Sequence, residues 1–206
     1  MMGCDDMDAM IKKAMKSHFP LAVAALLLCV LPACAALPEF HLRDTTGAVH
    51  TPAEWASRKA VVLYFTTIDC PVANSYVPEM NRIHDAYASR GVLFLAVQAD
   101  TSVAEPEVAR YAAEYRYAFP VVLDPRQVLV QLTGAATTPQ AAVVANDGRL
   151  LYLGRVDNRV EDFGKQRPSA TVFDLRDALD ATLAGKPVAH PSTRSIGCAI
   201  TRVTGQ

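Results

Sequence analysis

The sequence has almost no net charge and few cysteines, and these two shortages exclude several classes of protein. Its 206 residues include 20 Lys and Arg against 21 Asp and Glu, so the formal net charge is −1. Without a basic excess to attract phosphates, nucleic acid is not an expected partner. Five cysteines are neither a disulfide scaffold nor a zinc-finger count. Because 51 % of the residues are apolar, the chain can bury a core and is not expected to be disordered.

A metal site and a cofactor site are also not expected. The histidines that follow the N-terminal segment show no ligand spacing and are expected on the surface or in the core: His41, His50, His84 and His190. Three charged residues follow a predicted hairpin and are expected to be solvated: Arg155, Asp157 and Arg159. These residues therefore give no sign of a catalytic or metal-binding role.

An apolar run near the N-terminus is too short to span a membrane. It extends from Phe19 to Leu31, whereas a membrane-spanning helix needs roughly 20 residues. Lysines precede the run and small residues follow it, which is typical of a secretory signal rather than of a buried core helix. We therefore expect residues 1–36 to be a signal segment and the mature chain to be exported to the bacterial periplasm or cell envelope.

Two kinds of signal cleavage fit the end of this segment. Leu31–Cys34 resembles a bacterial lipobox, in which Cys34 would carry a lipid. Ala33–Ala35 fits an ordinary A-x-A cleavage site, and soluble export is slightly favoured. Membrane contact is expected only if Cys34 is lipidated. Cleavage near residue 36 leaves Cys70 and Cys198 as the only cysteines, in a compartment where disulfides persist.

From residue 37 onward, strand and helix patterns alternate. Apolar, β-rich runs bounded by turn residues predict strands at residues 60–65, 92–97 and 121–123 and a hairpin of residues 141–145 and 150–153. Helical spacing and capping signals predict helices from Pro71 to Gly91, from a capping box at 102–105 towards Tyr117, at 126–132, and from a capping box at 171–174 to Gly185. This order predicts an α/β sheet with helices on both faces.

One cysteine, Cys70, lies where a thiolate would be stabilised. It follows the predicted strand 60–65 and comes directly before Pro71, which suits the first turn of a helix. The N–H groups and the positive end of the helix dipole at that place should lower the pKa of the thiol and make it more nucleophilic. We expect a partly exposed, reactive thiol, and an inert buried cysteine is the alternative.

Residues 65–74 (FTTIDCPVAN) and residues 137–148 (TTPQAAVVANDG) together resemble the thioredoxin superfamily. Over residues 38–185 the chain is similar to the redoxin branch, which is related to alkyl hydroperoxide reductase and thiol-specific antioxidant proteins. The resemblance implies an α/β, thioredoxin-like fold over residues 37–186, with a central mixed β-sheet flanked by helices. Residues 187–206 would form a C-terminal tail.

The resemblance also implies roles for residues of these two segments. Cys70 would be the nucleophile, and Thr67 matches the threonine of the peroxiredoxin motif. The Thr138–Pro139 peptide bond would be cis and would lie beside the reactive cysteine. A cis proline exposes neighbouring backbone groups that can pair with an extended substrate, so Pro71, Thr138 and Pro139 are candidate substrate-binding residues. An ordinary turn proline is the alternative.

Several departures from the family patterns limit what the resemblance implies. Ala73 stands where thioredoxins have their second cysteine, so a short-range resolving thiol is missing. Leu63 stands where peroxiredoxins have a proline, and residues 137–144 lack the arginine that helps those enzymes hold the thiolate. Asn74 stands where copper-carrying relatives have a second cysteine, which argues against a metal site.

The second thiol lies on the C-terminal tail. Apolar residues flank Cys198, with Ile196 before it and Ile200 after it, and they predict that the tail docks on the domain. Such endings resemble those of a bacterial redoxin subgroup, in which the tail is expected to fold back. Cys198 is therefore a candidate resolving thiol for Cys70. The alternative is that Cys198 is a small apolar residue of the docked tail.

The sequence thus predicts an exported thiol-dependent oxidoreductase. Its expected partners are a disulfide or hydroperoxide substrate and a thiol reductant. A peroxiredoxin-type peroxidase is favoured by Thr67 and opposed by the missing proline and arginine. A thioredoxin-fold module that only binds a partner protein is the other alternative.

Overall fold

A computed structural model of the chain describes residues 37–203, all of which belong to one compact unit, residues 35–206. The expected signal segment, residues 1–36 with Cys34, lies outside the described residues. Between residues 37 and 203, no helix is long and apolar enough to cross a membrane.

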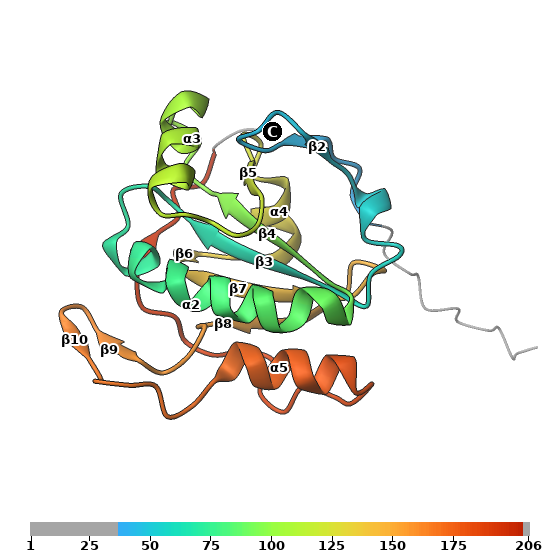
Figure 1. Cartoon of the computed structure of the whole chain (residues 1–206), viewed down its shortest axis with the longest axis vertical. Helices are drawn as coiled ribbons and strands as arrows, with labels where there is room; N and C mark the ends of the chain where they lie inside the picture. Colours follow the sequence, from blue (N-terminus) through green and yellow to red (C-terminus); the bar gives the residue numbers. More distant parts are fainter. Residues whose placement is uncertain (1–36, 204–206) are drawn as a thin grey trace, which may run out of the picture. The chain divides into compact units, whose positions relative to one another are not determined.

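The centre of this unit is a five-stranded mixed sheet with the strand order β5-β4-β3-β7-β8 (Figure 1). Strands β3, β4 and β5 run parallel to one another, whereas β7 runs antiparallel to both β3 and β8. Their bounds are β3 Ala60–Thr66, β4 Val92–Gln98, β5 Val121–Leu123, β7 Gln140–Val144 and β8 Leu150–Gly154. The mixed sheet implied by the resemblance is confirmed, and so is each strand predicted from the apolar runs.

Four α-helices among the described residues accompany this sheet. The bounds are α2 Pro71–Tyr87, α3 Glu105–Glu114, α4 Val128–Thr133 and α5 Asp174–Leu183. A 3-10 turn, η2 Ala88–Arg90, extends α2 to Gly91, whose positive φ of 93° ends the helix as predicted. Figure 1 shows α2 and α5 on one side of the sheet and α4 on the other.

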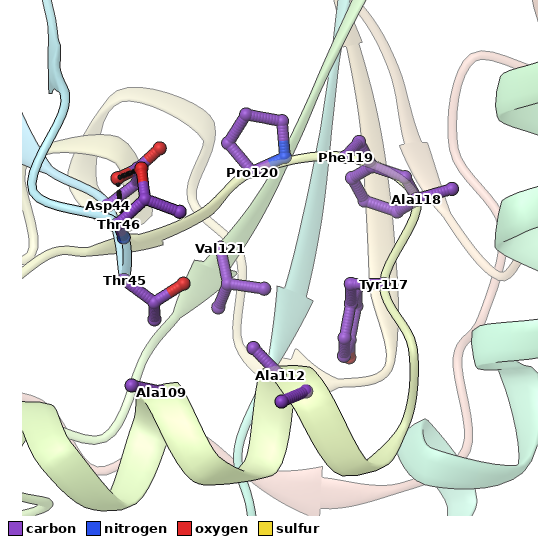
Figure 2. Close-up of a pocket in the computed structure, with 11 residues that line it drawn as sticks. Asp44, Thr45, Thr46, Ala109, Ala112, Tyr117, Ala118, Phe119, Pro120 and Val121 are labelled. Atoms are coloured by element: carbon purple, nitrogen blue, oxygen red, sulfur yellow. Dashed lines mark hydrogen bonds between the residues drawn. The ribbon is translucent and has the colours of Figure 1, made fainter.

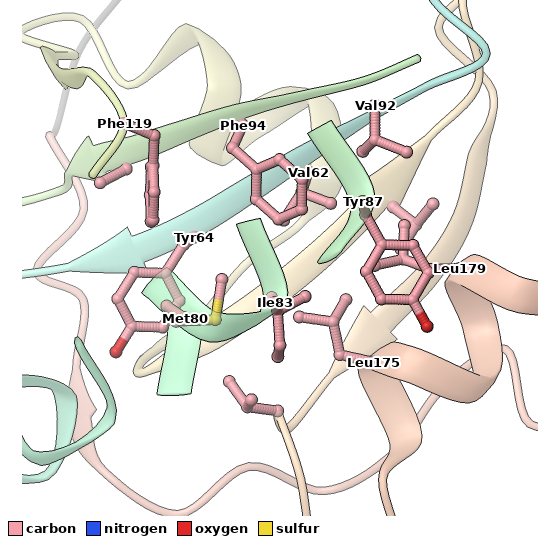
Figure 3. Close-up of a cluster of buried hydrophobic side chains, with 14 of the residues drawn as sticks. Val62, Tyr64, Met80, Ile83, Tyr87, Val92, Phe94, Phe119, Leu175 and Leu179 are labelled. Carbon is pink, nitrogen blue, oxygen red and sulfur yellow. The ribbon is translucent and has the colours of Figure 1, made fainter. Parts of the chain in front are cut away.

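Alternate residues of the central strand β3 enter two separate cores. Val62 and Tyr64 pack in one core with Met80 of α2 and Leu175 of α5 (Figure 3). The residues of β3 that point the other way, Val61, Leu63 and Phe65, form the second core. They pack there with Trp55, which follows η1 (Pro52–Glu54), and with Leu129 of α4. Full burial of each large apolar side chain stabilises the fold by roughly 1.5–3 kcal/mol. The carboxyl end of β3 is therefore a rigid place from which to present a reactive loop.

The sequence patterns did not predict the shortest strands. They form three separate pairs: β1 Leu42–Arg43 with β2 Val49–His50, β9 Val160–Asp162 with β10 Lys165–Gln166, and β6 Thr137–Thr138 with β11 Cys198–Ala199. A strand of two or three residues is too short to show a period of two, and these strands lack the apolar run that marks the equally short β5. These pairs therefore arise from tertiary contacts rather than from local sequence.

Both predicted capping boxes are wrong. Helix α3 begins at Glu105 after Ala104, while the Ser102 hydroxyl and N–H both donate to the Asp100 carboxylate. Helix α5 begins after Phe173 with no side-chain cap. Ser102 thus bonds a residue of the preceding turn, a local competitor of a helix cap. The Thr171 hydroxyl instead accepts a hydrogen bond of 2.8 Å from the side chain of Asn158, thirteen residues earlier.

The charged residues after the β7–β8 hairpin are not simply solvated. Asp157 is only 5 % exposed and accepts a hydrogen bond of 2.6 Å from the Tyr76 hydroxyl. Arg155 forms an ion pair with the buried Asp174 at the start of α5. The prediction that this segment is a solvated patch is wrong, because its partners lie on helices far away in the sequence.

Candidate active site

Cys70 lies at the junction between the central strand β3 and helix α2. It is the N-cap residue of α2, and its Sγ accepts a hydrogen bond of 3.4 Å from the Ala73 N–H. Pro71 occupies the first position of the helix, where the missing N–H costs nothing. The junction therefore has the geometry that the sequence predicted, with a helix N-terminus directed at the sulfur.

The Thr138–Pro139 turn lies directly against this sulfur. The Thr138–Pro139 peptide bond is cis, as the resemblance implies. The Cys70 thiol donates a hydrogen bond of 2.9 Å to the Thr138 carbonyl oxygen. The structure thus brings together Cys70, Pro71, Thr138 and Pro139, which the sequence had assigned to one site.

Thr67 contributes to this site mainly through its backbone. Its carbonyl oxygen accepts a hydrogen bond of 3.2 Å from the Cys70 N–H and so shapes the loop that carries the thiol. Thr67 also lines a small pocket of about 170 Å³ together with residues of the C-terminal tail, Cys198 among them.

The C-terminal tail docks as a strand across the same turn. In the antiparallel pair β11–β6, Cys198 lies opposite Thr138, and the Ile200 N–H donates to the Ala136 carbonyl at 2.9 Å. Gly197 lies so close to the turn that a side chain there would overlap the Thr138 carbonyl oxygen. The predicted docking of the tail is confirmed, and it brings the second thiol to the first.

Cys70 is fully buried, so the prediction of a partly exposed thiol is wrong. Its relative exposure is 0 %, whereas Cys198 keeps partial exposure. The docked tail contributes to this burial, because Cys198 lies opposite Thr138 and against the Cys70 sulfur. Both cysteines are free thiols in this structure.

The two thiols differ in their tendency to ionise. Burial raises the pKa of Cys70. Hydrogen bonds from the Thr138 side chain and the Ala73 N–H lower it, as do two from Cys198, and together they hold this pKa below the usual value of a thiol. Burial, and then the hydrogen bond and charge of Cys70, raise the pKa of Cys198 to about 11. Cys70 is therefore the thiol that ionises first.

A hydrogen-bond network under the reactive loop was missed by sequence reasoning. The Asn74 side chain donates to the Ile68 carbonyl at 3.0 Å and accepts from the Tyr111 hydroxyl at 2.8 Å. The Tyr64 hydroxyl donates to the Ala73 carbonyl at 2.8 Å. Asn74, which stands in place of a second cysteine, thus fixes the loop before Cys70. The only sequence signal for this role is its position four residues after that cysteine.

A larger hollow than the one beside Cys198 lies elsewhere. It measures about 570 Å³ and is bounded by Ala109 and Ala112 of α3 and by the segment Tyr117–Val121 (Figure 2). No cysteine lines it. Within residues 37–203, no three His, Cys, Asp or Glu side chains converge as a metal site would require.

Similar proteins include thiol-disulfide oxidoreductases. The ResA protein of Geobacillus thermodenitrificans is 28 % identical over 115 residues, which are 55 % of this chain and 63 % of that protein. The ResA protein of Halalkalibacterium halodurans is 28 % identical over 110 residues, 51 % of this chain and 60 % of that one. The chain thus matches less than two thirds of the length of these relatives.

Solved structures with the same architecture are also similar. A hypothetical protein from Sinorhizobium meliloti 1021 has a TM-score of 0.69 and 28 % identity, over 82 % of this chain and 94 % of that one. An uncharacterised conserved protein from Geobacillus kaustophilus has a TM-score of 0.68 and 26 % identity, over 83 % of this chain and 92 % of that one. A putative thiol:disulfide interchange protein DsbE from Chlorobium tepidum shares the fold. Its TM-score is 0.52 at 20 % identity, over 73 % of this chain and 94 % of that one.

The family follows from the match to a family model. The model described as Redoxin matches residues 32–170, which include β3, the Cys70 loop, α2 and the Thr138–Pro139 turn. Because this match covers more than half of the sequence, the chain belongs to the Redoxin family.

Proposed function

We propose that this protein is an exported thiol-disulfide oxidoreductase in which Cys70 is the nucleophile and Cys198 is the resolving thiol. One observation carries the proposal: the tail strand β11 holds Cys198 against a buried Cys70, and the two thiols have pKa values displaced in opposite directions. The names of the ResA relatives support a disulfide as the substrate.

The chemistry is two successive thiol-disulfide exchanges. Cys70 is buried, so the tail strand must first move away from it. The Cys70 thiolate then attacks one sulfur of a substrate disulfide, a mixed disulfide forms at Cys70, and the other substrate sulfur leaves as a thiolate. Cys198 then loses its proton and attacks the Cys70 sulfur, which releases the second substrate thiolate and leaves a Cys70–Cys198 disulfide. In the mixed disulfide Cys70 is no longer charged, so one of the causes that raise the pKa of Cys198 is removed at the moment when Cys198 must react.

Export is supported by the sequence pattern of residues 1–36, with soluble release slightly favoured over lipidation at Cys34. A disulfide-forming pair of thiols suits an oxidising compartment. The intact mass of the mature protein, measured before and after reduction, identifies the cleavage site, a lipid on Cys34 and an internal disulfide. A mature protein that retains residues 1–36 would contradict the proposal of export.

The main test compares two single substitutions. Cys70→Ser should abolish reduction of a disulfide substrate such as insulin, because the attacking sulfur is gone. Cys198→Ser should instead accumulate a mixed disulfide at Cys70, because the resolving step is lost. Both proteins should remain folded by circular dichroism. Substantial turnover by Cys70→Ser would show that Cys70 is not the nucleophile, and a Cys70 that forms no mixed disulfide would favour a module that only binds.

Peroxide reduction is the second candidate function. Thr67 and the small pocket beside Cys198 favour it, since the pocket admits a molecule the size of hydrogen peroxide. The Cys70 thiolate would attack a peroxide oxygen to form a sulfenic acid and release water or an alcohol, and Cys198 would then condense with it and release water. The rates at which one preparation reduces hydrogen peroxide and insulin decide between the two functions. Faster peroxide reduction favours a peroxidase, and faster insulin reduction favours a disulfide reductase.

A further inference from the structure

We propose that the thiol that re-reduces this protein attacks Cys198 rather than Cys70, entering through the small acidic pocket beside the tail, and that the pocket favours small thiols with a positive charge. The inference rests on the proposed Cys70–Cys198 disulfide. It adds two statements: which of the two sulfurs an external thiol attacks, and which class of thiol is the better reductant.

Access from solvent differs between the two sulfurs. Cys70 has no exposed surface, whereas Cys198 is partly exposed and lines the pocket of about 170 Å³. The other lining residues come from the loop before α2, from the end of β4 and from the tail: Thr67, Asp69, Ala99, Asp100, Ala199, Ile200 and Thr201. An incoming thiol therefore meets Cys198 first.

The tail is held on both sides of Cys198, so this access does not depend on its release. Downstream, the Gln127 side chain donates to the Thr201 carbonyl at 2.7 Å and accepts from the Val203 N–H at 3.1 Å. Upstream, the Thr193 hydroxyl contacts the Tyr152 hydroxyl at 2.6 Å. With both ends tied, the strand between them covers Cys70 and presents Cys198 to the pocket.

Cys70 is also the better leaving group. The external thiolate forms a bond to the Cys198 sulfur, the Cys198–Cys70 bond breaks, and the electron pair stays on Cys70 as a thiolate. In thiol-disulfide exchange, the sulfur with the lower thiol pKa leaves faster. The Ala73 N–H at the start of α2 is already directed at this sulfur to receive the charge. A second molecule of the same thiol then attacks the reductant sulfur of the mixed disulfide at Cys198. Cys198 is released as a thiol, and the two reductant molecules leave as their own disulfide.

The charge of the pocket sets the class of reductant. Two carboxylates, Asp69 and Asp100, lie among the residues that line it, and none of these residues is Lys or Arg. A thiolate that enters is repelled by both carboxylates, and a carboxylate on the same molecule adds further repulsion. An ammonium group on the thiol offsets this repulsion. A small aminothiol therefore fits this entrance better than an anionic thiol.

The position of attack can be trapped directly. The mature protein, whose only cysteines are Cys70 and Cys198, is oxidised, exposed to cysteamine for short times, quenched with acid, alkylated and digested for mass spectrometry. Cysteamine should appear first on the Cys198 peptide, with the alkylating agent on Cys70. Early adducts on Cys70, or equal amounts on both, would overturn the proposal. A starting protein without the Cys70–Cys198 disulfide would instead contradict the proposed function, and the mapping shows this before any thiol is added.

The charge preference needs matched thiols and matched variants. At equal thiolate concentration, cysteamine should reduce the oxidised protein roughly fivefold or more faster than 3-mercaptopropionate, with 2-mercaptoethanol between them. Asp69→Asn combined with Asp100→Asn should remove most of this difference. Glu39→Gln, which neutralises an exposed carboxylate that does not line the pocket, should leave it unchanged. Equal rates for the three thiols in the unmodified protein would overturn the charge preference.

Discussion

At the scale of single residues, the site depends on local sequence for the position of its nucleophile and on distant segments for its environment. The place of Cys70 at a helix start could be predicted, because strand 60–65 and the helix that begins at Pro71 both show clear local sequence patterns. Its burial could not be predicted, because it depends on a tail strand from the far end of the chain. The role of Asn74 could not be predicted either, since its partner Tyr111 lies on another helix.

The Thr138 side chain is one of the groups that hold down the pKa of Cys70. Its hydroxyl is buried and has no hydrogen-bond partner among the described residues while Cys70 is a neutral thiol, and it lowers the pKa of Cys70 by favouring the thiolate. Thr138→Val removes the hydroxyl at nearly constant volume, so the pKa of Cys70 should rise and the thiolate should form only at higher pH. The measurement is the thiolate absorbance against pH in a Cys198→Ser background, with and without Thr138→Val. An unchanged midpoint would show that this side chain does not stabilise the thiolate.

At the scale of elements, long periodic segments were predictable and two-residue strands were not. The runs at β3 and β4 and the spacing of α2 each extend over seven residues or more, which is enough to show a pattern. The β6–β11 pair has no such length, yet it creates the candidate site by placing the tail across the Thr138–Pro139 turn. The pair of strands that brings the second thiol to the site is thus the one with the weakest sequence signal.

Gly197 is the point at which the tail strand can be disrupted most selectively. A side chain at this position would overlap the Thr138 carbonyl and crowd Pro139, so Gly197→Ala should displace the strand at a cost of about 1–3 kcal/mol. Iodoacetamide should then alkylate Cys70 at least tenfold faster, and the yield of the internal disulfide should fall.

The matched control for this change is Ala199→Ser, on an exposed position of the same strand. It should leave both the alkylation rate and the disulfide yield near those of the unmodified protein. A Gly197→Ala protein that protects Cys70 as well as the unmodified protein would show that the tail does not cover the thiol.

At the scale of the whole molecule, the proposed disulfide would change the connectivity of the chain. It would join the loop after the central strand β3 to the C-terminal tail and close residues 70–198, most of the described domain, into one loop. The two cores on either side of β3 would stay as they are, because both thiols already lie side by side in the reduced form. Forming the disulfide would therefore act mainly by lowering the conformational entropy of the unfolded chain.

The free energy of unfolding should consequently depend on redox state. Closing a loop of more than 100 residues stabilises a protein by up to ~4–5 kcal/mol in the chain-entropy model, less any strain in the folded state. Urea unfolding of the oxidised protein should show a higher midpoint than unfolding of the reduced protein. The Cys198→Ser variant, which cannot form the bond, should show the same midpoint under both conditions. Equal midpoints for the unmodified protein would contradict loop closure.

The central claim is that Cys70 and Cys198 form one redox pair, and peptide mapping of the oxidised protein tests it most directly. The protein is treated with mild peroxide or oxidised glutathione, alkylated without reduction and digested. The account predicts a single disulfide-linked species that joins the Cys70 peptide to the Cys198 peptide, absent from the Cys198→Ser variant. Recovery of both cysteines as alkylated free thiols, under conditions that oxidise a model dithiol, would contradict it.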